Sequence, residues 1–126
     1  MVSKRGWDLE PFLAKIEREM KGGFLAMLML QVFRRGREPL YGYALVQSLR
    51  ELSNGKVVVP EGTIYPILRS LENHGLLRSE WGNSDAGPRR RYYRLTPAGE
   101  QAAEDARRLW EGLLEGARDV MGGLGP

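Results

Sequence analysis

The stretch that decides the fold is GPRRRYYRLTPAG, residues 87–99. It places four arginines and two tyrosines in six consecutive positions and then continues into Leu-Thr-Pro. Thr96 suits the N-cap of a following helix, and Pro97 suits its first position. Upstream, LLRSEWG at 76–82 is also strand-like, and the loop between the two runs is rich in Gly, Asn, Ser and Asp. These features predict a β-hairpin that leads into a helix.

Three compact helices are predicted before the hairpin. Residues 24–35 are apolar on nearly every side, which indicates a centrally buried helix. Residues 41–53 and 61–74 each carry an apolar stripe at helical spacing and are followed by glycine. Between them KVVV, residues 56–59, is β-branched and predicts a short strand. The residues expected in the core are Leu45, Leu49 and Leu52 in the second helix and Ile64, Leu68 and Leu71 in the third.

Glycine and proline set the expected ends and contacts of these helices. Gly36 can serve as the C-terminal cap of the first, and Gly42 would let the second pack closely on the first. Pro66 is compatible with a third helix that begins near Thr63, whereas a start at Glu61 loses one backbone hydrogen bond. The sequence leaves both starts open.

Two further helices flank this unit. Asp8 can cap a helix that runs to about Met20, after which Lys-Gly-Gly at 21–23 breaks or bends the chain, and the last helix runs to about Met121. The predicted fold is mainly α with a small β-hairpin, a winged helix-turn-helix with N- and C-terminal dimerisation helices. The expected parts are an N-terminal helix at 1–21, the winged helix-turn-helix at 22–95 and a C-terminal helix at 96–126.

The composition excludes several classes of protein. The chain of 126 residues has no cysteine, which excludes disulfides and thiolate sites. Its most apolar run, 22–33, is too short to cross a bilayer, and its start lacks the apolar core of a signal peptide. We therefore expect a cytoplasmic protein without a membrane partner. Residues 1–99 have an excess of positive charge and 100–126 an excess of negative charge. This asymmetry favours a polyanionic partner; the alternative is ordinary variation in charge along a chain.

No catalytic or metal site is recognisable, so we expect neither an enzyme nor a cofactor. The single histidine, His74, precedes Gly75 and suits the end of a helix better than a base or a metal ligand. Glu104 and Asp105 are predicted to be solvated charges on the outer face of the last helix. The chain has no Cys/His cluster, glycine-rich phosphate loop or nucleophile elbow.

The arginine-rich strand predicts a contact with nucleic acid. Alternation along a strand puts Tyr93 and Leu95 toward the core and leaves the arginines near the hairpin tip in solvent. Arginine presents planar hydrogen-bond donors that suit phosphate, so these side chains favour a contact with the nucleic-acid backbone. The alternative is that they belong to an edge strand whose charges only prevent aggregation. The predicted contacts to the nucleic-acid backbone are Arg89, Arg90 and Arg91.

The outer face of helix 61–74 is small and polar with one arginine, which favours entry into the major groove of DNA. Arg69 suits guanine or phosphate, and Asn73 suits adenine. The alternative is a plain solvent-exposed face, which would usually carry more Lys and Glu. The residues predicted to reach DNA from this helix are Thr63, Tyr65, Arg69, Ser70 and Asn73.

The last helix carries a wide apolar stripe although the domain before it looks complete, which predicts a twofold homodimer. The alternative is a helix folded back on its own domain. Trp110 lies in mid-helix, and two such tryptophans at a helix crossing could enclose a flat aromatic molecule or fill the dimer core. The stripe consists of Ala102, Ala106, Leu109, Leu113 and Val120, with Ala103, Trp110, Leu114, Ala117 and Met121 beside them.

Three stretches resemble the PadR family of bacterial transcriptional regulators: LYGYALVQSLRELSNG, PEGTIYPILRSLENHGLLRSEWG and GPRRRYYRLTPAGEQ. The resemblance implies a homodimeric winged-helix repressor of a pseudo-palindromic operator, which in many members is released by a small aromatic or drug-like ligand. By position, Tyr41 would approach the DNA backbone, and Trp110 falls where some smaller members have a tryptophan facing a cavity between subunits. Two positions depart from the family pattern, because Pro60 replaces a polar cap and Ser70 a frequently basic residue.

The sequence therefore predicts a dimeric DNA-binding transcriptional regulator, a repressor that responds to a small aromatic or drug-like ligand. The alternative is a winged-helix protein–protein interaction module without nucleic-acid binding. Such modules tend to expose apolar residues at the positions where this chain has arginines and small polar side chains.

Overall fold

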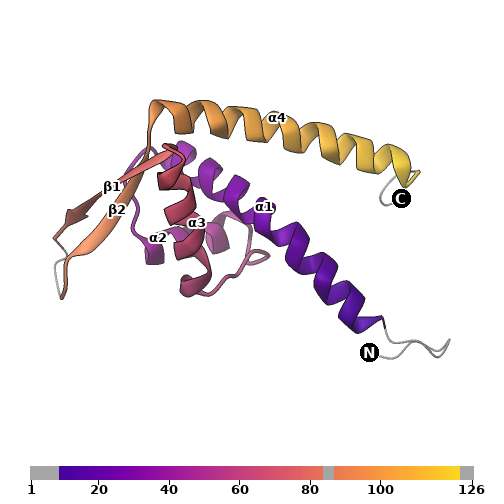
Figure 1. Cartoon of the computed structure of the whole chain (residues 1–126), viewed down its shortest axis with the longest axis horizontal. Helices are drawn as coiled ribbons and strands as arrows, with labels where there is room; N and C mark the ends of the chain where they lie inside the picture. The colour runs from indigo at the N-terminus through magenta and orange to yellow at the C-terminus, as the bar shows by residue number, and fades with distance from the viewer. Residues whose placement is uncertain (1–8, 84–86, 123–126) are drawn as a thin grey trace.

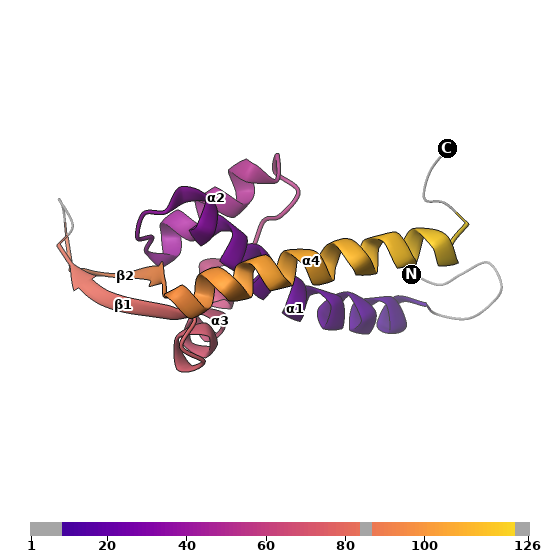
Figure 2. The ribbon, with the colours of Figure 1, turned by 90° about the horizontal axis from the view of Figure 1, so that it is seen from above.

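The structure is a computed structural model that describes residues 9–83 and 87–122. Figures 1 and 2 show a hairpin at one end of an elongated molecule, and the N-terminus of α1 and C-terminus of α4 at the other end. The predicted class, mainly helical with one antiparallel hairpin, is confirmed. In chain order the elements are α1 (Glu10–Gly36), α2 (Gly42–Leu52), α3 (Glu61–Asn73), β1 (Leu77–Gly82), β2 (Arg90–Leu95) and α4 (Pro97–Val120).

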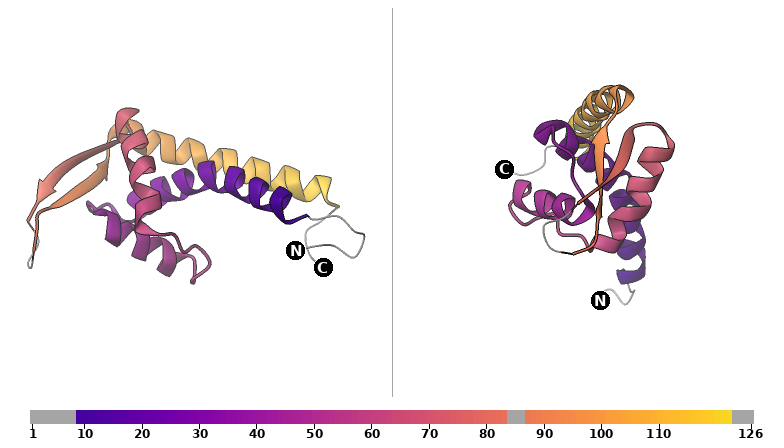
Figure 3. Two further views of the ribbon diagram at one scale, coloured as in Figure 1. Left: turned by 60° about the horizontal axis from the view of Figure 1, so that its bottom comes forward. Right: turned by 90° about the vertical axis from the view of Figure 1, so that its left-hand side faces the viewer.

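The core forms where the second half of α1 meets α2 and α3, at the end of α1 nearer the hairpin (Figure 3). The apolar run of α1 supplies Met29, and the stripes of the two shorter helices supply Leu45, Ile64 and Leu68; all four are fully buried. The predicted core stripes are therefore confirmed except at Leu52, which is exposed because it lies in the last turn of α2.

The hairpin of β1 and β2, called the wing below, is anchored at its base. Tyr93 of β2 is buried and exchanges two backbone hydrogen bonds of 2.9 Å with Leu40, which precedes α2. The strand predicted at 56–59 is wrong, since residues 57–59 run outside any helix or strand. Leu40 bonds the edge of β2 that faces away from β1, and Val57 and Val59 pack against the core instead of joining the sheet.

α1 is one continuous helix, so the break predicted at 21–23 is wrong. A glycine in a helix costs only about 1 kcal/mol relative to alanine. Neighbouring contacts reduce this cost: Phe24 packs on α4, and Lys21 pairs with Glu17 at 2.7 Å one turn earlier, an exposed ion pair that contributes about 0.2–0.5 kcal/mol.

The ends of α1 also differ from expectation. The cap predicted at Gly36 lies one residue later, at Arg37, which adopts the left-handed conformation with φ of 61°. The Arg37 N–H bonds the Phe33 carbonyl at 3.2 Å, and Gly36 thereby remains in the last helical turn. Leu9 occupies the N-cap position, and the predicted cap at Asp8 lies outside the described residues.

α4 begins where three elements meet. Thr96 is its N-cap, as predicted: the hydroxyl accepts a hydrogen bond from the Gly99 N–H at 3.0 Å and donates one to the Gly75 carbonyl at 2.6 Å. Gly99 is buried, and a Cβ at this position would collide with the carbonyl oxygen of Leu76 and lie 2.8 Å from the Leu95 side chain. The first turn of α4 is therefore held against the connection between α3 and β1.

Replacing Gly99 with alanine should destabilise the protein by about 1–3 kcal/mol, the usual cost of overpacking, because the colliding atom belongs to the backbone. Urea unfolding at fixed protein concentration would measure the change. The matched control is Gly112→Ala in the same helix, where an added Cβ meets nothing within 4 Å. The control should gain about 0.5–1 kcal/mol from helix propensity. Equal unfolding midpoints for the two variants would contradict the close contact at Gly99.

Candidate nucleic-acid interface

The exposed side of α3 carries all five residues predicted there. Because α3 begins at Glu61, Pro66 lies inside it and one backbone hydrogen bond is missing. The apolar stripe of α3 faces the core, which leaves the remaining side chains in solvent. The residues on this exposed side, called the α3 face below, are Thr63, Tyr65, Arg69, Ser70 and Asn73.

Tyr41 brings the supporting helix to the wing. Its ring lies 4.3 Å below the guanidinium carbon of Arg90, a cation–π contact, and its centroid is 5.5 Å from that of Tyr92 in an edge-on arrangement. The contact orients Arg90 without neutralising its charge or occupying its in-plane donors. Sequence analysis missed Tyr92, and its position on the same side of the strand as Arg90 was the available signal.

A groove of about 600 Å³ separates the wing from the first turns of α2 and α3. It brings together Tyr41, Tyr65 and the three predicted wing arginines, which are distant in sequence. Arg69, Ser70 and Asn73 do not line it, because they lie further along α3. The lining residues, called the wing groove below, are Tyr41, Gly42, Tyr43, Glu61, Tyr65, Trp81, Arg89, Arg90, Arg91 and Tyr93.

Gly42 allows α2 to approach α3, not the preceding helix as predicted. A Cβ on Gly42 would lie 2.6 Å from the Tyr65 hydroxyl oxygen. The same hydroxyl donates a hydrogen bond to Glu61 at 3.1 Å, and burial together with this carboxylate raises the pKa of Tyr65. Tyr65 therefore stays protonated at neutral pH and is fixed at the edge of the α3 face.

The three wing arginines have different surroundings. Arg89 and Arg90 are exposed, and Arg90 leans on Tyr41. Arg91 faces α3, with its Nη2 3.7 Å from Oε1 of Glu72 and its guanidinium 5.5 Å from the Trp81 ring. Thus the strand distributes its charges over two faces of the wing.

A second groove, of about 740 Å³, lies between α1 and α4. Trp110 is on its wall, partly exposed and packed on Phe24 with ring centroids 5.4 Å apart. The walls are almost entirely apolar. This apolar groove is lined by Glu17, Met20, Lys21, Gly23, Phe24, Ala26, Met27 and Leu30 of α1 and Ala106, Leu109, Trp110 and Leu113 of α4.

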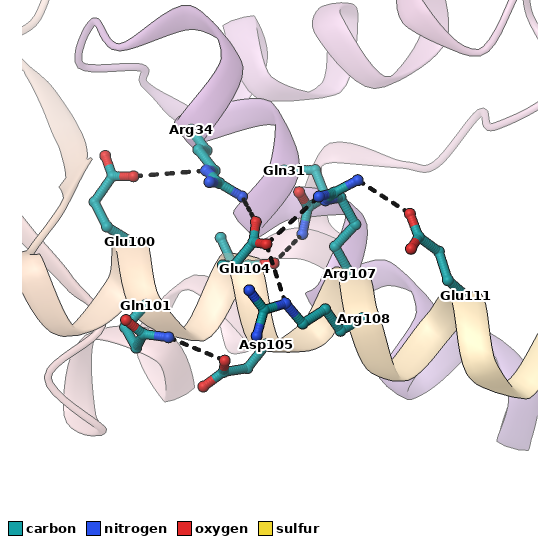
Figure 4. A network of polar contacts seen from close by, with 10 residues as sticks. Gln31, Arg34, Glu100, Gln101, Glu104, Asp105, Arg107, Arg108 and Glu111 are labelled. Carbon is teal, nitrogen blue, oxygen red and sulfur yellow. Dashed lines mark hydrogen bonds and ion pairs between the residues drawn. The ribbon is translucent and has the colours of Figure 1, made fainter.

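A polar network joins α1 to α4 (Figure 4). Its contacts with α1 involve earlier residues of α4 than those that line the apolar groove, so it lies nearer the wing. Arg34 donates to Glu104 at 2.6 Å and lies 3.8 Å from Glu100, and Gln31 donates to the Ala103 carbonyl at 2.7 Å. Hydrogen bonds from Arg34 and Arg107 lower the pKa of Glu104 to about 2.

The prediction that Glu104 is a solvated outer charge is wrong. Packing of α4 on α1 brings Arg34 to this carboxylate from 70 positions away in the sequence, a contact that no local pattern shows. Asp105 is exposed as predicted and accepts a hydrogen bond from Gln101 at 3.0 Å. The two adjacent carboxylates therefore have different roles.

His74 is the C-cap residue of α3, as predicted, with Nδ1 2.8 Å from the Ser70 carbonyl oxygen. Within residues 9–83 and 87–122, no three His, Asp or Glu side chains are grouped so that they could hold a metal ion. Over the same residues, no helix combines the length and apolar character needed to cross a membrane.

Comparison with known proteins gives a consistent result. Residues 29–105 match the family model described as transcriptional regulator PadR-like family. Transcriptional regulator Rv3488 of Mycobacterium tuberculosis is 49% identical over 74 residues, which are 59% of this chain and 65% of that protein, slightly less than two thirds of its length.

Solved structures agree on the fold. A PadR family transcriptional regulator from Eggerthella lenta is 35% identical, with a TM-score of 0.72 over 89% of this chain and 94% of that one. Bacillus subtilis PadR in complex with operator DNA is 23% identical, with a TM-score of 0.58 over 65% of this chain and 45% of that one. Together with the wing, these similarities establish a PadR-type winged helix.

Glu104 should make the free energy of unfolding depend on pH. Its pKa in the folded protein, about 2, is below the ordinary value of 4.5. Its contribution is therefore complete above about pH 4.5 and disappears as the pH falls toward 2. Glu104→Gln should be less stable than wild type near pH 7, and the difference should shrink steadily below pH 4.5. Thermal unfolding followed by circular dichroism across this range would show the convergence.

The matched control for this experiment is Asp105→Asn, which removes the same charge from the adjacent position. Its carboxylate accepts from Gln101 within α4, so the change should be much smaller. A constant gap between Glu104→Gln and wild type at every pH would show that Glu104 does not stabilise the protein through its charge.

Proposed function

We propose that this chain, which belongs to the PadR-like family of transcriptional regulators, is a dimeric repressor that binds a pseudo-palindromic operator in double-stranded DNA. Family membership confirms the prediction of a regulator rather than an enzyme. The observation that carries the DNA-binding proposal is the exposed polar α3 face beside a wing groove lined by three arginines.

The α3 face supplies the sequence-specific part of the proposed interface. A helix with small polar side chains fits a major groove about 12 Å wide. Arg69 and Asn73 would contact base edges, and Thr63, Tyr65 and Ser70 would contact bases or nearby phosphates. The related Bacillus subtilis PadR was solved with operator DNA, which supports the same use of the fold here.

The wing supplies the electrostatic part. Arg89 and Arg90 would contact phosphates, with Arg90 held in place by Tyr41, and Arg91 adds to the positive charge of the wing. Arginine contacts to phosphate give affinity that depends strongly on salt and little on sequence. Tyr41 would therefore lie close to the DNA backbone, as the family resemblance implies.

The distal half of α4 supports a homodimer. Leu109 is 65% exposed and Leu113 is 60% exposed, although both lie on the wall of an apolar groove. On the first half of α1, Phe12 and Met20 are also exposed. Contiguous apolar surface of this kind usually marks an interface. In the proposed dimer, α4 of each subunit covers this surface on the other.

The apolar groove is also the proposed ligand site. Trp110 and Phe24 present aromatic rings to it, and its volume of about 740 Å³ suits a small aromatic or drug-like molecule. A flat ligand stacked on Trp110 would occupy the space between α1 and α4 and change how the subunits meet. Release of DNA would follow from the altered spacing of the two α3 faces.

Arg90→Ala should weaken binding to every duplex and reduce the slope of log affinity against log salt by about 0.9 for each phosphate that the wing no longer neutralises. The measurement is fluorescence anisotropy at several salt concentrations, with one duplex from the region upstream of the protein's own coding sequence and one of random sequence. Both duplexes should be affected equally, since a phosphate contact carries no sequence information.

The control is Arg118→Ala, which removes the same charge near the end of α4 remote from the wing (Figure 1). It should leave the salt slope unchanged. Equal slopes for the two variants would refute the assignment of Arg90. If wild type binds neither duplex in dilute salt, the alternative of a protein-interaction module replaces the DNA-binding proposal. Reduced transcription in vitro from the bound upstream DNA would test repression.

Leu113→Glu should convert the dimer to a monomer at micromolar concentration, because it places charge in the apolar groove. Sedimentation velocity would measure the change, and a flat aromatic dye that binds the wild type should bind the variant more weakly. Gln101→Glu adds the same charge to α4 outside the apolar groove and should remain dimeric. If the wild type sediments as a monomer, the proposed dimer is refuted.

A further inference from the structure

Glu72 joins α3 to both strands of the wing. Its Oε2 accepts a hydrogen bond from the hydroxyl of Ser79 on β1, and its Oε1 lies 3.7 Å from Nη2 of Arg91 on β2. The Glu72 side chain is 30% exposed and the Arg91 side chain 42% exposed, so the contact lies at the surface but is partly sheltered. One acidic side chain therefore connects three elements.

The register of the wing explains this arrangement. Ser79 is opposite Tyr93 and Trp81 is opposite Arg91, so these four side chains share the face of the wing that is turned to α3. Tyr93 is buried at the base, and Arg91 comes next toward the tip, 5.5 Å from the Trp81 ring. The guanidinium of Arg91 is thus held between a carboxylate and an aromatic face.

We infer that Glu72 is a positioning residue that sets the angle between the wing and α3. Arg91 acts as a strut, meaning that its ion pair with Glu72 holds the wing in place, and not as a phosphate ligand. This inference rests on the proposed DNA-binding function and deepens it. It divides the wing arginines by role: Arg90 and the exposed Arg89 contact the DNA, and Arg91 holds the wing in the orientation that lets them do so.

The physical need for a strut follows from the shape of the wing. A two-stranded hairpin is marginally stable by itself. Beyond Tyr93, no residue of β2 toward the tip is fully buried. Tyr92 is half-buried against the Tyr41 ring, and the two arginines that follow toward the tip are exposed. Glu72 ties α3 to the base of the wing through Ser79, and to the part beyond that base through Arg91. Moving Arg91 to a phosphate would also leave a carboxylate without its cation beside the DNA.

A competing arrangement predicts the opposite sign. If Arg91 leaves Glu72 to bind phosphate, the carboxylate only competes with DNA. Neutralising Glu72 would then strengthen binding, and Arg91→Gln would reduce the salt slope by about 0.9. If Glu72 positions the wing, neutralising it weakens binding although a negative charge has been removed from the interface.

The test is a cycle of Glu72→Gln, Arg91→Gln and the double variant, measured on the upstream and random duplexes. We expect Glu72→Gln to weaken binding about two- to fivefold, the range for a partly exposed ion pair, and to have little further effect when Arg91 is already replaced. The control is Glu51→Gln, which removes the same charge from an exposed position in the last turn of α2, outside the wing groove. It should not weaken binding.

A second measurement does not involve DNA. In protein labelled with 5-fluorotryptophan, the ¹⁹F resonance of Trp81, assigned with Trp81→Phe, should shift in Glu72→Gln and in Arg91→Gln while that of Trp110 stays unchanged. If wild type does not bind DNA, the proposed function fails, and the Trp81 signal alone decides whether the strut exists. An unchanged Trp81 resonance, or tighter DNA binding by Glu72→Gln, would overturn the inference.

Discussion

The structure depends on the close contact between the first turn of α4 and the connection from α3 to β1. Gly99 leaves no room for a side chain against the Leu76 carbonyl, and the Thr96 hydroxyl bonds the Gly75 carbonyl at the end of α3. These contacts make the end of α3, the base of the wing and the start of α4 one unit. The direction of α4 is therefore set relative to the α3 face, and any dimer formed through α4 inherits a defined spacing between two such faces.

Beyond this junction, α4 changes from a polar to an apolar contact with α1. The Arg34–Glu104 pair and the Gln31 bond to Ala103 fix the two helices near the wing, whereas Trp110 and Leu113 line an apolar groove further along. The polar end needs no further partner, because its charges are already paired. The apolar end gains free energy from any apolar surface that covers it. Dimer and ligand are therefore both proposed for the distal end.

The sequence predicted structural features well where the residues of a single helix or strand determine them. The α3 stripe, the Thr96 cap and the inward Tyr93 depend on local periodicity and were confirmed. The errors arose where a contact with a residue distant in the sequence determines the structure. The sheet pairs β2 with Leu40 and not with the valines at 57–59, and Glu104 is not a free surface charge because α1 supplies Arg34. At 22–23 the predicted break does not form, because each glycine costs a helix only about 1 kcal/mol and the next residue, Phe24, packs on α4.

The same distinction applies to the charge of the wing. Arg90 and Arg91 are adjacent and chemically identical, but strand alternation sends them to opposite faces. Arg90 rests on an aromatic ring, which orients a cation without neutralising it, whereas Arg91 meets the carboxylate of Glu72. A count of arginines therefore overstates the charge that the wing can present to a polyanion. The register of the hairpin, and not the composition of the strand, determines which cation is available and which one supports it.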